Sequence, residues 1–288
     1  MLAYEDFTKA LGGLFEELLP LYVPKAHGKV GTKVRTKVRA EQGDTEPVTD
    51  LDNYTLARLR GLIIGWFPGD YTIGEEDTKS PAEIARILAD QTNYYWTIDG
   101  LDGTWHFIRG SWSYGAMVSR RQGNRILYAA IFRPVDMALC GTGFFFAELG
   151  EGAWEWCRDD NEYHQLHTAP FGDPKKVPRA LERTTVLLEG GSKLFFTGSV
   201  ASLGAKVTTR PSLSSCIAAT TVARGDASAL VTKGNKPWDT WPAIGIIEAA
   251  GGIVTNHRGE PRQLHNCGDM VAAANEDDLA GILKLLNP

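Results

Sequence analysis

The segment 94–104 constrains the fold most strongly, because an apolar run ends there in two carboxylates and a Gly-Thr pair. Residues 94–98 read Tyr-Tyr-Trp-Thr-Ile, which predicts a short strand followed by a turn. Asp99 and Asp102 come next, and their spacing lets both carboxylates and the Leu101 carbonyl turn toward one point. Carboxylates and carbonyls are ligands that a hard cation such as Mg2+ takes. The segment therefore predicts a strand that ends in a metal site.

Acidic residues lie at several other expected boundaries, and the sites together are Asp52, Glu75, Asp99 with Asp102, and Asp239. Each has a plainer interpretation when it is taken alone. Asp-Gly pairs are common in turns, and Glu75 with Glu76 fits a solvated loop. Asp239 fits the N-cap of a helix expected over residues 241–250, where a carboxylate is favourable. Their occurrence together favours the metal site.

Gly103 and Thr104 follow the second aspartate and offer two successive backbone N–H groups without steric cover. Such groups form an anion-binding nest. The chain contains 31 glycines in 288 residues, and a glycine excess indicates tight turns or backbone brought close to a ligand. Of these glycines, Gly103 is the one that we expect to tolerate a Cβ least.

Composition excludes several classes of protein. The net charge of −5 disfavours a dedicated nucleic-acid-binding protein. The four cysteines are scattered without a Cys-x-x-Cys pair, which disfavours a disulfide framework or a zinc ribbon and favours a reducing compartment. The N-terminus is acidic where a signal peptide is basic, and no apolar run approaches the roughly 18 residues of a spanning helix. We expect a soluble cytoplasmic protein with no membrane partner.

The chain length allows one large α/β unit or two smaller ones. Hydrophobic spacing predicts helices over 4–22, 50–65 and 81–89, and strands over 113–119, 126–132, 144–149 and 152–156. Strands over 184–188, 227–231 and 252–255 then alternate with helices over 214–224 and 241–250. This change predicts an N-terminal α+β lobe, residues 1–140, with most of the metal ligands. A C-terminal α/β lobe, residues 141–288, carries Asp239 and the specificity segment of the same compact unit.

Residues 29–39 form a basic stripe, because every second position there is Val or Thr and the basic residues between them are Lys29, Lys33, Arg35, Lys37 and Arg39. This alternation places the charges on one face of a strand or hairpin. One interpretation is a solvated hairpin edge protected by lysine. The other is a cationic arm over an anionic ligand.

The acidic motifs resemble the signature of the inositol monophosphatase superfamily, the Mg2+-dependent, lithium-sensitive phosphatases. Four pieces match in order, from about residue 47 to residue 252: Val48-Thr49-x-x-Asp52, Gly74-Glu75-Glu76, Trp96-x-Ile98-Asp99-x-x-Asp102-Gly103-Thr104-x-x-Phe107, and Trp238-Asp239 with Glu248-Ala249-x-Gly251-Gly252. The resemblance implies an alternating αβαβα layered sandwich of the inositol monophosphatase and fructose-1,6-bisphosphatase type, in the α/β (α+β) class and usually a homodimer.

The resemblance also implies residue roles. Two or three Mg2+ ions would be bound by Glu75, Asp99, the Leu101 carbonyl, Asp102 and Asp239. Asp52, Thr104 and Glu75 would be catalytic, with Asp52 and Thr104 orienting the water that attacks phosphorus. The Gly103 and Thr104 amides would hold the phosphate beside Asp239, and no protein nucleophile is required. The basic stripe falls where the family has a mobile hairpin over the metal site.

The chain departs from the inositol-selective pattern, which places a glutamate shortly before the Trp-Asp pair. Residues 227–237 contain no carboxylate, which disfavours an inositol phosphate as the natural substrate. Lys233 and Lys236 could instead meet an anionic substrate group, or be solvated surface lysines. Trp105 would line the pocket, and His106 would either touch substrate or be structural.

These observations predict an inositol monophosphatase-like phosphomonoesterase that hydrolyses a small phosphorylated alcohol. The run Lys236-Pro237-Trp238-Asp239 is somewhat more similar to histidinol-phosphate phosphatases of the superfamily, which is the alternative activity. A third hypothesis is a non-catalytic member that binds RNA or a protein partner through the basic stripe.

Overall fold

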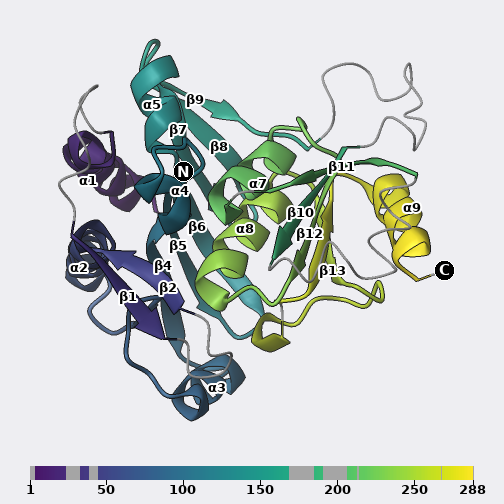
Figure 1. Cartoon of the computed structure of the whole chain (residues 1–288), viewed down its shortest axis with the longest axis horizontal. Coiled ribbons are helices and arrows are strands. Elements are labelled where there is room, and N and C mark those ends of the chain that lie inside the picture. Colours follow the sequence, from purple (N-terminus) through teal and green to yellow (C-terminus); the bar gives the residue numbers. More distant parts are fainter. Residues whose placement is uncertain are drawn as a thin grey trace.

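Two β-sheets with helices between and outside them form the molecule (Figure 1). The computed structural model describes residues 4–23, 33–38, 45–168, 185–190, 206–212, 214–266 and 268–287. Helices α1 (Glu5–Tyr22) and α2 (Asp50–Trp66) cover the outer face of the larger sheet, and α9 (Glu276–Leu286) covers the smaller one. Helices α7 (Ser215–Ala223) and α8 (Pro237–Ala249) lie between the sheets. This order confirms the expected αβαβα sandwich.

The larger sheet is mainly an antiparallel meander, with only its first two strands parallel. Its strands are, in spatial order, β3 (Tyr71–Gly74), β4 (Tyr94–Asp102), β5 (Gly115–Gln122), β6 (Arg125–Phe132), β7 (Thr142–Glu148), β8 (Gly152–Cys157) and β9 (Glu162–Gln165). The expected lobe boundary at residue 140 falls inside this sheet, since β6 and β7 pair across it. The division into lobes stays a prediction.

The smaller sheet is mixed. Its strands are, in spatial order, β11 (Thr208–Pro211), β10 (Thr185–Gly190), β12 (Ala229–Lys233), β14 (Met270–Ala273) and β13 (Ile253–Asn256). Strand β10 runs parallel to β11 and β12, with Glu189 opposite Thr232. Because parallel strands end at the same sheet edge, residues at the ends of β10 and β12 come together there.

The remaining elements are short: the hairpin β1 (Val34–Val38) and β2 (Thr45–Thr49), and helices α3 (Pro81–Ala89), α4 (Thr104–Ile108) and α5 (Pro134–Cys140). A 3-10 turn covers Leu264–Asn266. None of the helices in these ranges combines the length and the apolar character that crossing a membrane requires.

Apolar side chains fill three clusters: one between α1, α2 and the larger sheet, one around α7 and α8 between the two sheets, and one between the smaller sheet and α9. Between the sheets, apolar side chains of α7 and α8 pack against both sheets, and Trp241 is fully buried. Under α1, aromatic rings pack onto the larger sheet, including Phe15 stacked on Phe132 at 4.5 Å between centroids. Helix α1 ends at Tyr22, as expected, although Pro20 lies inside it, and buried Tyr22 holds its last turn against the core.

Candidate metal centre

An acidic cleft of about 260 Å3 opens where β4, α4, α7 and α8 meet. Its described lining residues are Glu46, Pro47, Glu75, Asp99, Leu101, Asp102, Gly103, Thr104, Trp105, His106, Glu189, Ser214, Ser215, Asn235 and Asp239. Oxygen atoms of Asp99, Asp102 and Asp239 all lie within 4.8 Å of one another. The carboxylates expected to bind metal therefore come together, although Asp239 follows Asp102 by more than a hundred residues.

Strand β4 reaches further than its apolar run indicates, and continues through Asp102. The register against β5 shifts between Asp99 and Asp102, which is a β-bulge. Bulges re-aim side chains near active sites, and here the Leu101 N–H donates to Asp99 Oδ1 at 2.9 Å. The strand irregularity thus places both carboxylates at the cleft.

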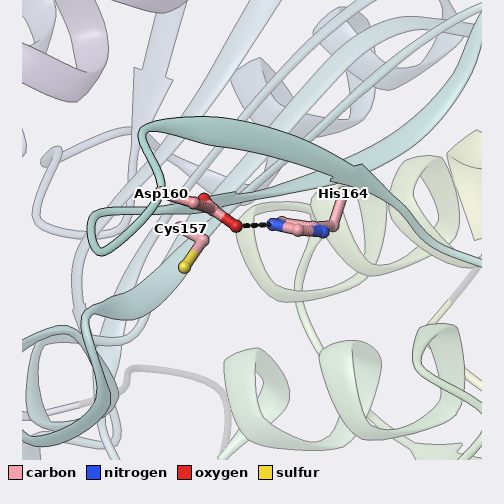
Figure 2. Close-up of side chains that lie close together, drawn as sticks. All are labelled: Cys157, Asp160 and His164. Carbon is pink, nitrogen blue, oxygen red and sulfur yellow. Dashed lines mark hydrogen bonds and ion pairs between the residues drawn. The ribbon is translucent and has the colours of Figure 1, made fainter.

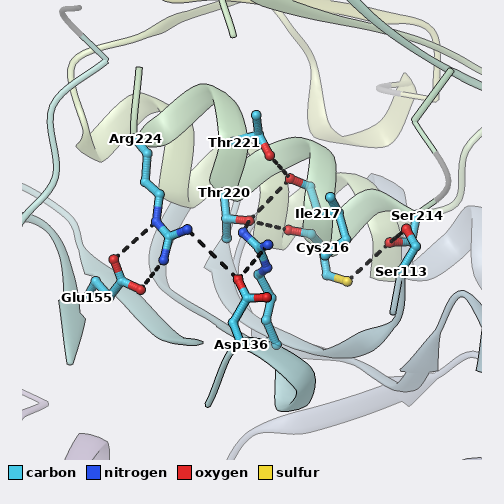
Figure 3. A network of polar contacts seen from close by, with 10 residues as sticks. Ser113, Asp136, Glu155, Ser214, Cys216, Ile217, Thr220, Thr221 and Arg224 are labelled. Carbon is cyan, nitrogen blue, oxygen red and sulfur yellow. Dashed lines mark hydrogen bonds and ion pairs between the residues drawn. The ribbon is translucent and has the colours of Figure 1, made fainter. Parts of the chain in front are cut away.

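Helix α7 fixes Asp102, since the Cys216 N–H donates to Asp102 Oδ2 at 2.6 Å. Figure 3 shows the contacts that hold this helix against the larger sheet. Arg224 forms an ion pair with Glu155 on β8 and lies 3.9 Å from Asp136 Oδ2 on α5. The first turn of α7 also places a positive dipole end next to the Asp102 carboxylate, which offsets part of the rise that burial causes in the pKa of Asp102.

Asp52 lies buried beside the cluster at the start of α2. A capping box fixes it, because Thr49 donates its backbone N–H to Asp52 Oδ2 at 2.7 Å and accepts from the Asp52 N–H. The Thr104 hydroxyl lies 3.0 Å from Asp52 Oδ1 and 3.0 Å from the Leu101 carbonyl oxygen. The structure thus brings Asp52 and Thr104 into contact, and Thr104 bridges toward the cluster.

Burial dominates the electrostatics of the cleft. It raises the pKa values of Asp99 and Asp239 well above their ordinary range, and the nearby Glu75 carboxylate adds to both shifts. Among the described lining residues there is no lysine or arginine to offset this charge. Clustered carboxylates with a nearby backbone carbonyl are the donor set of a hard divalent cation. The residues present therefore fit a Mg2+ site.

Gly103 turns the chain from β4 into α4 with a φ of 81°. A Cβ added there would lie 2.4 Å from the Ser113 carbonyl oxygen, closer than real Cβ contacts allow. The neighbouring backbone thus excludes a side chain, in agreement with the expectation for Gly103.

Asp239 is not the N-cap of its helix. Helix α8 begins at Pro237, four residues before the expected start at 241, and Asp239 is its third residue. Its Oδ2 accepts the Lys236 backbone N–H at 3.0 Å. Proline suits the first helical position because it lacks an N–H that would otherwise be unsatisfied. Pro237 therefore marks the start of α8, which the spacing of apolar residues alone placed at residue 241.

Of the other predicted site residues, some line the cleft and one does not. Trp105 and His106 line the cleft, and the Arg109 guanidinium lies 4.9 Å from the Trp105 ring centroid. Lys233 is exposed at the end of β12 and is not among the described lining residues. Its role in substrate binding stays a prediction.

The basic stripe lies only partly within the described residues, since Lys29 and Arg39 fall outside them. Lys33 directly precedes strand β1 and is exposed, as is Arg35 on the strand, and Lys37 lies in register opposite Glu46 of β2. Because Glu46 lines the cleft, this hairpin reaches the site from one side. Its proposed contact with an anionic ligand stays a prediction.

Sequence reasoning missed Glu189, Ser215 and Asn235. The predicted strand 184–188 stopped one residue before Glu189. An acidic residue directly after an apolar strand is the same signal that identified Asp99, and it could have found Glu189.

A second group of metal-binding side chains, Cys157, Asp160 and His164, lies on the β8–β9 hairpin (Figure 2). Asp160 Oδ2 and His164 Nε2 are 2.8 Å apart, and both side chains are about half exposed. None of the three lines the acidic cleft. A solvent-exposed hydrogen bond accounts for the contact.

A family model described as the inositol monophosphatase family matches residues 17–287. The chain belongs to the inositol monophosphatase family. It is therefore a member of a family of phosphatases, hydrolases that act on phosphate monoesters.

Curated relatives carry different names. A histidinol-phosphatase from Chlorobaculum parvum is 29% identical over 237 residues, covering 81% of this chain and 80% of the relative. A fructose-1,6-bisphosphatase/inositol-1-monophosphatase from Aquifex aeolicus is 25% identical over 228 residues, 77% of each. The solved structure of an IMPase/NADP phosphatase with Mg2+ and phosphate has a TM-score of 0.75 at 16% identity, over 98% of this chain and 95% of that one. The structural likeness shows the shared fold, and the names leave the substrate open.

Proposed function

We propose that this protein is a Mg2+-dependent phosphomonoesterase that releases phosphate from a small phosphorylated alcohol. The observation that carries the proposal is the convergence of Asp99, Asp102 and Asp239 within 4.8 Å. The Asp52–Thr104 contact next to them adds a proton acceptor at the same place. A cleft with both features suits hydrolysis better than binding alone.

The metal would be held by the five groups that the motifs predict: Glu75, Asp99, the Leu101 carbonyl, Asp102 and Asp239. Mg2+ supplies charge neutralisation for the phosphate and lowers the pKa of a water molecule. Two or three Mg2+ ions fit this number of donors. We also expect lithium to inhibit the phosphatase activity.

Asp52 and Thr104 orient the attacking water. Two hydrogen bonds from Thr49 fix Asp52 Oδ2, so Oδ1 is the atom that faces Thr104. The Thr104 hydroxyl donates to Asp52 Oδ1 and can accept from a water molecule through its free lone pairs. The water proton would pass through Thr104 Oγ1 to Asp52 Oδ1, and Glu75, which also lines the cleft, would help to hold the same water.

Gly103 and Thr104 present their backbone N–H groups where a phosphate would lie. The turn at Gly103 frees both amides from strand pairing, and the first turn of α4 follows directly. Trp105 and His106 then form the wall on the leaving-group side.

Replacing Thr104 by alanine is expected to lower kcat by about 100-fold or more, because it removes the group between water and Asp52. Thr104→Ser keeps the hydroxyl and should retain most of the activity. Steady-state phosphate release by the two variants measures the difference. Equal activity of Thr104→Ala and Thr104→Ser would contradict the role of the hydroxyl.

The proposal is tested with purified protein, Mg2+ and a panel of inositol, sugar and histidinol phosphates, ranked by kcat/KM. Release from at least one ester that stops on chelation of Mg2+ is expected, and no release from any of them would remove catalysis from the account. A non-catalytic RNA-binding member would instead bind RNA with affinity that falls steeply with salt.

Histidinol-phosphate hydrolysis is the second candidate. Two observations favour it: the 29% identical histidinol-phosphatase and the absence of a carboxylate in residues 227–237. A higher kcat/KM for histidinol phosphate than for inositol phosphate would support it.

We further expect a homodimer in the cytoplasm, and light scattering tests the dimer.

A further inference from the structure

Glu189 is a buried carboxylate in the cleft that the proposed chemistry does not use. It follows the apolar part of β10, is 9% exposed, and lines the acidic cleft. One carboxylate oxygen, Oε1, accepts a hydrogen bond from the hydroxyl of Ser215 at the start of α7. The other, Oε2, is buried and lies within hydrogen-bond distance of no described donor. Burial raises the pKa of this carboxyl to about 8, and the nearby Ser215 and Asn235 side chains oppose that rise. An unsatisfied buried acceptor costs about 1–3 kcal/mol, so such a group calls for a ligand.

The surrounding contacts hold this side chain in place. Asn235, in the loop after β12, points its amide at Ser215 Oγ at 3.4 Å. Because β10 and β12 are parallel neighbours, Glu189 and Asn235 both lie at the sheet edge that faces the cleft. Ser215 thus ties the carboxylate to α7, the helix that also fixes Asp102.

The charge of the cleft indicates which ligand suits Glu189. Two carboxylates, Glu46 and Glu189, line the cleft in addition to the four proposed for metal. The described lining residues include no lysine or arginine, and burial and the nearby Arg109 lower the pKa of His106, which favours its neutral form. Metal and phosphate would offset each other's charge, so the remaining wall is acidic. An acidic wall favours a cation and disfavours a neutral polyol.

We propose that Glu189 is a specificity-determining residue that binds a protonated amine on the leaving group, so that the substrate is the phosphate monoester of an amino alcohol. The ammonium group would donate to Glu189 Oε2, with Ser215 and Asn235 keeping the carboxylate oriented. This inference rests on the proposed phosphomonoesterase activity and narrows its substrate class.

The test uses matched phosphate esters, ω-aminoalkyl and ω-hydroxyalkyl phosphates of two, three and four carbon atoms, which differ only in the terminal group. With wild-type protein and Mg2+, we expect kcat/KM for at least one amine to exceed that of its hydroxyl partner by about 10- to 100-fold, the range of a charge-assisted hydrogen bond. Glu189→Gln should bring this ratio close to one. Glu151→Gln, an exposed change outside the cleft, should leave the ratio at the wild-type value.

Calorimetry with the same esters and Ca2+ in place of Mg2+ measures the preference without turnover. Hydrolysis of both esters without preference in any pair, or a preference that survives in Glu189→Gln, would overturn the inference and leave the phosphatase proposal standing. Tighter amine binding that Glu189→Gln removes, with no hydrolysis of any ester, would support this site and contradict the proposed activity. If Glu189→Gln unfolds at the same temperature as wild type, its lost preference for the amine reflects substrate recognition and not a loss of stability.

Discussion

Asp99→Asn is expected to lower Mg2+ affinity by at least about 100-fold and to lower turnover with it, because it removes a charged oxygen from the centre of the cluster. Changes outside the direct ligands of metal sites already cost about 10- to 100-fold. Titration calorimetry with Mg2+ and phosphate release measure the two effects on one preparation. Asp160→Asn, on the exposed hairpin of Figure 2, is the matched control and should change neither.

The same substitution should raise the stability of the metal-free protein. Burial raises the pKa of Asp99 in the folded state, so the folded protein binds more protons than the unfolded chain above the ordinary aspartate range. Stability without metal therefore falls as pH rises from about 4, and Asp99→Asn should flatten this fall. Thermal unfolding with chelator across pH 4 to 8 measures it. Unchanged Mg2+ binding together with an unchanged pH profile would contradict the ligand assignment.

Gly103→Ala is expected to lower the free energy of unfolding by about 3 kcal/mol and to abolish activity. A left-handed residue with a Cβ costs roughly 1–2 kcal/mol, and here the Cβ also meets the Ser113 carbonyl oxygen at 2.4 Å. Relief of that contact would shift the two amides proposed to hold phosphate. Urea unfolding and phosphate release measure the two losses.

Gly110 supplies the control, because its φ of 69° is also left-handed while nothing lies within 4 Å of an added Cβ. Gly110→Ala should therefore lose only the backbone cost of about 1 kcal/mol and keep its activity. If the two alanine variants lost equal stability, the close contact at Gly103 would have no energetic effect.

Local sequence patterns specify much of this fold. Helix α3 follows its expected bounds because a Ser-Pro start and a capping box fix its beginning. Strand β4 was predicted too short, since Asp99 to Asp102 look like a turn and become strand only when β5 pairs with them. Helix α4 is too short, and strand β9 too polar, to give a periodic signal.

The residues of the candidate site show the same difference between local signals and long-range contacts. Asp52, Asp99 and Asp239 were found because each lies in a local motif at the end or start of an element. Glu189 and Asn235 were missed because their proximity depends on the pairing of β10 with β12 and on the packing of α7. Contacts between distant segments leave no local signal in one sequence.

The central claim is that the acidic cleft, at the end of β4, is the metal centre of a phosphatase. Anomalous diffraction from crystals soaked in Mn2+ and phosphate tests it most directly, since Mn2+ takes the oxygen ligands of Mg2+ and scatters anomalously. We predict anomalous peaks between Asp99, Asp102 and Asp239, with phosphate against the Gly103 and Thr104 amides. A cleft without metal, or metal only at Cys157, Asp160 and His164, would contradict the account.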